Sequence, residues 1–205
     1  MLRAIAFGGL LALPFLAPLL TGCTSGDMMK TIFVPPVVAI DSNIPKYLHN
    51  VSQIKFWDRM STANRATSFA WWDSTGQVHE MNDYYDKVIV LAFFGTWSPP
   101  SLAQLASIDT LLRSNDTNMR LIGVTLRERA QGGKAVLLID SFATARSIPY
   151  QLLIGSRDFA FTYGGVDAVP MTFVISRKRK ITATLEGYIP ANKLREAIAK
   201  AEEMP

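Results

Sequence analysis

The chain has 205 residues, of which 49% are hydrophobic and 19% are charged, and its formal net charge at pH 7 is +4. These values are typical of one globular domain that carries an apolar N-terminal extension. The small charge, without interleaved aromatic and basic side chains, argues against a nucleic-acid partner.

An uncharged apolar segment extends from Ala4 to Leu20. It is at the short end for crossing a bilayer, prolines interrupt it and no basic cluster follows, so a cleaved signal fits better than a retained anchor. Its end, Leu20-Thr21-Gly22-Cys23, resembles the lipobox of bacterial lipoproteins. The resemblance implies a signal peptide at residues 1–22 and a lipid on Cys23. The protein would then be anchored in the bacterial cell envelope and face the periplasm or the exterior. Which membrane holds it stays open, and a buried, unmodified Cys23 is the alternative.

Residues 23–66 are expected to form the lipidated tether and an adapter segment, because their pattern is irregular and prolines interrupt it. Within residues 44–60, Tyr47, Val51 and Ile54 recur at roughly helical spacing, which predicts a short helix. This segment could pack on the domain or dock on a partner.

Regular patterns begin after Ala66. The run Lys87–Phe94 is continuously apolar and β-branched, which is typical of a strand buried on both faces. Other segments alternate between strand and helix patterns, which predicts an α/β domain at residues 67–205, with a mixed sheet and helices on both faces. The predicted strands are 69–72, 77–81, 87–94, 119–125, 152–154, 171–176 and 181–186, and the predicted helical segments are 101–113, 134–146, 158–163 and 191–203.

Two motifs in this order resemble those of a known family. Phe93-Phe94-Gly95-Thr96-Trp97-Ser98-Pro99-Pro100-Ser101 is similar to the active-site segment of TlpA- and ResA-type membrane-tethered thiol-disulfide oxidoreductases, which carry Trp-Cys-x-Pro-Cys there. Ala168-Val169-Pro170-Met171-Thr172 resembles the same family's cis-proline loop and the strand after it. The resemblance implies a thioredoxin-like (redoxin) fold.

Ser98 and Ser101 stand where that family has its catalytic cysteines, so we expect no catalytic residue at either position. The family's nucleophile is a thiolate, activated at a helix N-terminus, and peroxiredoxin-type chemistry also needs a cysteine. A serine attacks only with the help of an adjacent base. The two histidines, His49 and His79, are not placed for this by the sequence and are expected to be surface or packing residues.

Peptide recognition needs no sulfur. In the resembled family, the cis-proline loop pairs with an extended substrate chain. The resemblance therefore implies a groove formed by Trp97, Pro99, Val169 and Pro170, with the Ser98 and Ser101 hydroxyls at its rim. The alternative is that these serines only cap the helix, and that the prolines fit its first turn.

No metal or cofactor is expected, because the histidines are far apart and no Asp/Glu pairs cluster. Met28-Met29 stands alone in the tether, which does not make a copper site. The basic run Arg177–Lys180 is expected to be a solvated hairpin turn, with contact to an acidic partner or anionic headgroups as the alternative.

Three functions remain as hypotheses. The first is a lipid-anchored, redox-inactive domain that binds an envelope protein or peptide as an assembly factor, chaperone or scaffold. The second is the family's thiol-disulfide oxidoreductase activity in altered form, which the lack of active-site cysteines disfavours. The third is a structural spacer with a vestigial groove.

Overall fold

The computed structural model describes residues 51–204 except 59–63, 74, 85 and 115–117. The predicted signal peptide 1–22, the predicted lipidation site Cys23 and His49 lie outside the described residues. Within the described part, one mixed sheet has eight strands in the order β3-β2-β1-β6-β5-β4-β7-β8. The strands are β1 (Val51–Trp57), β2 (Phe69–Trp72), β3 (Val78–Glu80), β4 (Val88–Phe94), β5 (Met119–Thr125), β6 (Gln151–Ile154), β7 (Met171–Ile175) and β8 (Ile181–Glu186).

The parallel strands lie in the centre of this sheet. β4, β5, β6 and β1 are paired in parallel, whereas β7 and β8 at one end, and β2 and β3 at the other, run antiparallel to their neighbours. Every residue of β4 is buried, as its continuous apolar sequence predicts. The connections β4-α1-β5 and β5-α2-β6 carry the helices that parallel pairing requires.

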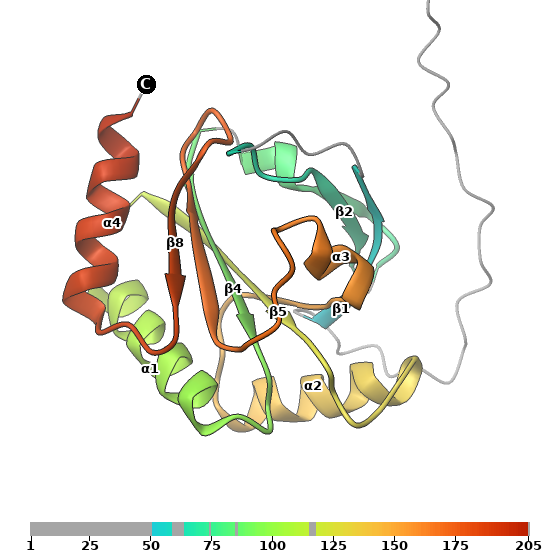
Figure 1. Ribbon diagram of the computed structural model, residues 1–205. Coiled ribbons are helices and arrows are strands. Elements are labelled where there is room, and N and C mark those ends of the chain that lie inside the picture. The colour runs from blue at the N-terminus through green and yellow to red at the C-terminus, as the bar shows by residue number, and fades with distance from the viewer. Residues whose placement is uncertain (1–50, 59–63, 74, 85, 115–117, 205) are drawn as a thin grey trace, which may run out of the picture. The chain divides into compact units, whose positions relative to one another are not determined.

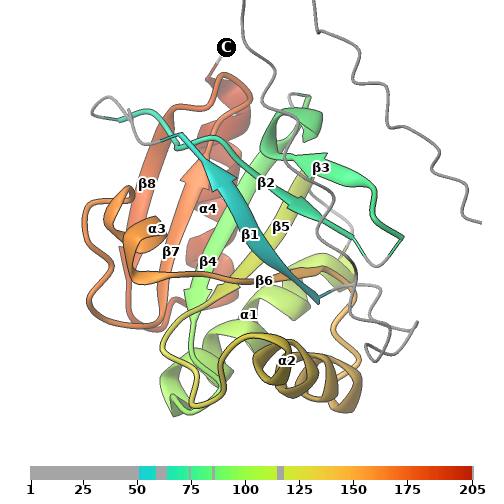
Figure 2. The same cartoon turned by 90° about the vertical axis from the view of Figure 1, so that its right-hand side faces the viewer.

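Helices cover both faces of the sheet, which confirms the predicted α/β architecture with a mixed sheet (Figures 1 and 2). One core cluster joins the sheet to α1, α2 and α4, and a second cluster on the opposite face contains residues of α3. Figure 1 shows α1 beside α4 on the first of these faces. The helices are α1 (Pro99–Ser114), α2 (Gly133–Ala145), α3 (Arg157–Phe161) and α4 (Ala191–Glu203), with a 3-10 turn at Met81–Tyr84.

An aromatic cluster fixes α3 against the sheet. The Phe159 ring is fully buried, and its centroid lies 5.2 Å from that of Phe69 in β2 and 6.0 Å from that of Phe93 in β4. Tyr163, just after α3, donates its hydroxyl proton to the Thr67 carbonyl at 3.0 Å, and burial raises the pKa of this phenol. The loop from α3 to β7 is therefore held to the core at its start.

The predicted helix within residues 44–60 is wrong where the structure describes it, because Val51–Trp57 is strand β1. This strand lies between β2 and β6, so the sheet begins ahead of the expected domain boundary at residue 67. The pairing with β2 shifts register between Ile54 and Phe56, which indicates a β-bulge. The bulge interrupts the usual alternation of buried and exposed side chains, and the remaining spacing imitates a helix.

The basic run forms the predicted hairpin turn between β7 and β8. Arg177, Lys178 and Lys180 are exposed, but Arg179 is buried and has a left-handed φ of 63°. The Arg179 carbonyl accepts a hydrogen bond from the Ala66 N–H at 2.8 Å, so the turn is tied to the chain that enters β2. The prediction that the whole basic run is solvated was therefore wrong for Arg179.

Candidate functional site

The turn between β4 and α1 is closed by Ser98. Its N–H donates to the Gly95 carbonyl at 3.1 Å, and its hydroxyl oxygen accepts from the Ser101 N–H at 3.4 Å. A side-chain oxygen that accepts from the N–H three residues later in the chain is typical of a helix N-cap. Pro99 then occupies the first position of the helix, where the N–H that proline lacks would have no partner within the helix. Ser98 is therefore the N-cap of α1.

Ser101 holds the same turn from inside the protein. Its hydroxyl oxygen accepts from the Gly95 N–H at 3.3 Å, and its side chain is fully buried. Only 5% of Ser98 is exposed, so the expectation that both hydroxyls lie at the rim of a groove was wrong. Within the described residues, neither hydroxyl is hydrogen-bonded to a histidine or a carboxylate that could act as a base.

Trp97 lies over this turn with 46% of its surface exposed. A β-carbon on Gly95 would lie 2.8 Å from Cε2 and from Nε1 of the Trp97 ring, closer than real β-carbons approach other atoms. Glycine at position 95 is therefore what lets the ring lie against the backbone. Pro99, the next predicted groove residue, is also exposed.

The Val169–Pro170 bond is cis and directly precedes β7. Phe93 of β4 pairs with Met171 of β7 in an antiparallel register. Gly95, beneath Trp97, follows Phe93 by two residues, and Val169 precedes Met171 by two, so both lie beyond the same end of β4 and β7. The structure thus brings the two sequence motifs to the same end of these two neighbouring strands, where Val169 is partly buried and Pro170 is buried.

Glu128, which the sequence did not single out, holds the turn to the end of β5. Its carboxylate accepts hydrogen bonds from the Thr96 N–H at 2.9 Å, from the Thr96 hydroxyl at 2.6 Å and from the Thr125 hydroxyl. Hydrogen bonds to a charged acceptor are stronger than neutral ones. Glu128 therefore fixes the residue next to Trp97.

Arg127, the neighbour of Glu128, reaches the opposite side of the site. Its Nη1 donates to the Asp167 carbonyl at 2.9 Å, and its Nη2 lies 3.6 Å from Asp167 Oδ1. Arg127 has a φ of 57°, which is uncommon for a residue other than glycine and common at functional loops. One short loop therefore contacts both the Trp97 turn and the segment that leads to Pro170.

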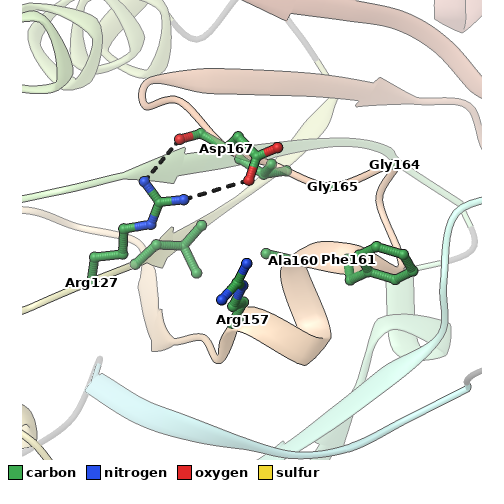
Figure 3. Close-up of a pocket in the computed structure, with 9 residues that line it drawn as sticks. Arg127, Arg157, Ala160, Phe161, Gly164, Gly165 and Asp167 are labelled. Atoms are coloured by element: carbon green, nitrogen blue, oxygen red, sulfur yellow. Dashed lines mark hydrogen bonds and ion pairs between the residues drawn. The ribbon is translucent and has the colours of Figure 1, made fainter.

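A pocket of about 270 Å³ lies beside this segment (Figure 3). Its walls come from the loop after β5, from α3 and from the chain between α3 and Pro170. In Figure 3, Arg157 lies between Arg127 and Ala160, and Phe161 lies at the far end of α3. None of the predicted groove residues Trp97, Pro99, Val169 and Pro170 lines this pocket, so it is a separate feature next to them.

The sequence profile of the AhpC/TSA family matches residues 62–184, which is more than half of the chain. The chain belongs to the AhpC/TSA family. The match contains both motifs, the Glu128 loop and the pocket, and it begins after β1.

Individual relatives of this AhpC/TSA-family chain are distant. The thiol-disulfide oxidoreductase ResA of Geobacillus thermodenitrificans is 22% identical over 138 residues, which are 67% of this chain and 76% of the relative. A thiol:disulfide interchange protein of Chlorobium tepidum has a TM-score of 0.58 at 16% identity, covering 69% of this chain and 97% of that one. The exposed lipoprotein thioredoxin of Streptococcus pneumoniae has a TM-score of 0.52 at 19% identity, covering 65% of this chain and 98% of that one. The structural matches show the thioredoxin-like fold.

His79, the histidine that the structure describes, lies away from the candidate site of this AhpC/TSA-family domain. His79 lies on β3, separated from β4 by four strands of the sheet. Its Nε2 is 2.9 Å from Asp73 Oδ2, and its ring stacks on Trp71 with centroids 5.8 Å apart, which confirms it as a packing residue. Burial alone would raise the pKa of the Asp73 carboxyl, but hydrogen bonds from Thr75, His79 and Gln77 hold that pKa well below its usual value of 3.8.

Two further properties concern ligands and membranes. No group of three or more His, Cys, Asp or Glu side chains within the described residues is arranged to hold a metal ion. Among the helices described, none has both the length and the hydrophobicity to cross a bilayer.

Proposed function

We propose that this protein is a lipid-anchored, redox-inactive thioredoxin-like domain of the bacterial cell envelope that binds extended protein or peptide chains, as an assembly factor, chaperone or scaffold. One observation carries the proposal. The backbone of Ala168 and Val169, just before β7 and at the same end of the sheet as the Trp97 turn, makes no hydrogen bond to any other described residue. An extended chain can pair with such backbone groups as an added strand.

The surroundings of these backbone groups suit a binding site. The exposed Trp97 ring offers a large, rigid apolar surface, and tryptophan is enriched among the residues that dominate binding energies. The hydrogen bonds from Thr96 to Glu128 and from Arg127 to Asp167 order both sides of the site before a ligand binds. Such pre-organisation lowers the entropic cost of association.

The absence of thiol chemistry follows from the sequence and is supported by the hydrogen bonds. Residues 24–205 contain no cysteine, and exchange of a disulfide requires a thiolate as nucleophile. The hydroxyls at the two serine positions are buried and accept backbone hydrogen bonds instead. The alternative is the oxidoreductase activity that the name of ResA states, with thiols supplied by a partner. It is disfavoured because electrons cannot pass through this domain without a cysteine of its own.

Location in the envelope is supported by the lipobox-like sequence before Cys23 and by the resemblance to an exposed lipoprotein of Streptococcus pneumoniae. A spacer without any binding function is the remaining alternative. Binding measurements distinguish it from the proposed function.

The test uses fluorescein-labelled α-lactalbumin, reduced and carbamidomethylated so that it stays unfolded, and the purified full chain in detergent. Fluorescence anisotropy should show saturable binding of this probe, and folded α-lactalbumin should not bind. Trp97→Ala should weaken binding roughly thirtyfold, because truncation of a central tryptophan at an interface costs about 2 kcal/mol or more. Pro170→Thr should also weaken it, by altering the loop that presents Val169.

Phe56→Ala is the matched control. Phe56 is an aromatic residue of β1 with 42% of its surface exposed, similar to the 46% of Trp97, and two strands separate β1 from β4. Its removal should leave affinity unchanged. Absence of binding by the wild-type protein, or equal losses in Trp97→Ala and Phe56→Ala, would contradict the proposed site.

A further inference from the structure

The pocket beside the cis-proline segment contains more positive than negative charge. Two arginines, Arg127 and Arg157, and one carboxylate, Asp167, line it. Asp167 already accepts from Arg127, whereas the Arg157 guanidinium makes no hydrogen bond or ion pair with any other described residue. One guanidinium thus remains available to an anion in the pocket.

The rest of the pocket is apolar and open. Phe161 is 77% exposed, the largest exposed fraction among the large hydrophobic residues described, and Val166 contributes to the wall. Gly164 and Gly165 have φ angles of 85° and 79°, which other residues rarely adopt, and a β-carbon on Gly164 would meet nothing within 4 Å. The pocket therefore has room for the aliphatic part of a side chain below a charged end group.

The pocket is continuous with the proposed peptide site along the chain. Asp167 lines the pocket, and Ala168 and Val169 follow it directly. Two residues of extended chain span roughly 7 Å. Arg157 and Asp167 line the same pocket, so a peptide that pairs at Val169 and continues for about two residues toward Asp167 would bring a side chain to that pocket. A guanidinium can bind the planar carboxylate of a peptide side chain through two parallel hydrogen bonds.

We propose that this pocket, with Arg157 as its principal cation, binds the carboxylate of an Asp or Glu side chain in the peptide held at Ala168–Val169. The protein would then prefer acidic segments of extended chains. This inference rests on the proposed function, since it names the class of peptide that the same site selects. Phe161 packs against the methylene groups of the bound acidic side chain, and Arg127 keeps the Asp167 segment in place.

The experiment compares peptides that differ only in charge. Overlapping twelve-residue peptides of α-lactalbumin are synthesised twice, once as in the protein and once with Asn and Gln in place of Asp and Glu. Their affinities for the full chain in detergent are measured by fluorescence anisotropy at low ionic strength, where charge interactions are least screened. Among the peptides that bind, we expect the acidic form to bind about tenfold more tightly, a difference of about 1.4 kcal/mol.

Arg157→Gln should reduce this preference to about twofold or less, because the remaining arginine is already paired with Asp167. Arg177→Gln is the matched control. It removes the same charge from an exposed residue in the turn beyond the far end of β7, so the tenfold preference should persist. The Arg157 side chain is exposed and makes no hydrogen bond with any other residue in the described part of the chain, so its replacement should leave the melting temperature unchanged.

The outcomes separate the two proposals. Equal binding of acidic and neutral peptides, or an unchanged preference in Arg157→Gln, would overturn the inference about the pocket and leave peptide binding intact. An equal loss of preference in Arg157→Gln and Arg177→Gln would show that net charge alone attracts the peptides, and would also overturn it. If neither form of any peptide binds, the proposed function and this inference are both wrong.

Discussion

Replacing Glu128 by alanine should destabilise the protein through the turn that carries Trp97. The Glu128 carboxylate accepts three hydrogen bonds, two from Thr96 and one from Thr125. A hydrogen bond to a charged group contributes roughly 1.5–3 kcal/mol. Because Glu128 is only partly buried, water replaces part of what the substitution removes. We therefore expect Glu128→Ala to lower the free energy of unfolding by about 2 kcal/mol.

Two further variants identify the cause of this loss. Glu128→Gln keeps one carbonyl oxygen for the Thr96 N–H and offers an amide to the Thr96 hydroxyl, so the expected loss is about 1 kcal/mol or less. Thr96→Val removes the hydroxyl alone, and a double-mutant cycle with Glu128→Ala should give a coupling energy of about 1 kcal/mol. Urea unfolding followed by far-ultraviolet circular dichroism measures each value. A loss below about 0.5 kcal/mol in Glu128→Ala, or strict additivity in the cycle, would refute the reasoning.

Two other predictions concern the Trp97 ring and the entry hairpin. Gly95→Ala should weaken binding of unfolded α-lactalbumin, because the added β-carbon would lie 2.8 Å from the Trp97 ring and displace it. The melting temperature should change little, because the ring is exposed and can move away. Unchanged affinity would count against a role of the ring in binding. Asp73 has a folded-state pKa below its usual 3.8, so its ionised form stabilises the fold above about pH 4 and this contribution is lost as pH falls further. The stability difference between wild type and Asp73→Asn, measured by urea unfolding, should therefore shrink as the pH falls below about 4, whereas a difference that stays the same down to about pH 2 would contradict the assignment.

The central fold was predictable because its signals are local and strong. β4 is an unbroken run of apolar residues, β5 is apolar except for Arg120 and Thr125, and α1 has apolar residues three or four positions apart. These burial patterns specify the three elements. β1 could not be assigned, because its bulge breaks the alternation that identifies a strand, and because its partners β2 and β6 are distant in the sequence. The buried side chain of Arg179 was also unpredictable, since a basic run in a turn is normally solvated.

The candidate site was predictable only where a motif marks it. Trp97 and Val169 belong to segments that resemble the family's, and their placement at the same end of two neighbouring strands follows from the pairing of β4 with β7. Glu128, Arg127 and Arg157 are charged residues at the start of a loop or a short helix, where no periodicity distinguishes a functional residue from a solvated one. Residues 126–128 directly follow the buried strand β5, and ligands of α/β sheets often bind beyond the carboxyl ends of the strands. This position was the signal that could have indicated Arg127 and Glu128.

The most direct test of redox inactivity is dithiothreitol-driven reduction of insulin by the native protein and by a Ser98→Cys, Ser101→Cys double variant. The native protein should give no acceleration over dithiothreitol alone, because it offers no thiolate after Cys23. The double variant should gain activity, because residue 98 caps α1 and a thiolate there would be stabilised by the helix N-terminus. Acceleration by the native protein, after removal of contaminating oxidoreductases, would contradict the central claim. A folded but inactive double variant would contradict the view that the site keeps the family's geometry.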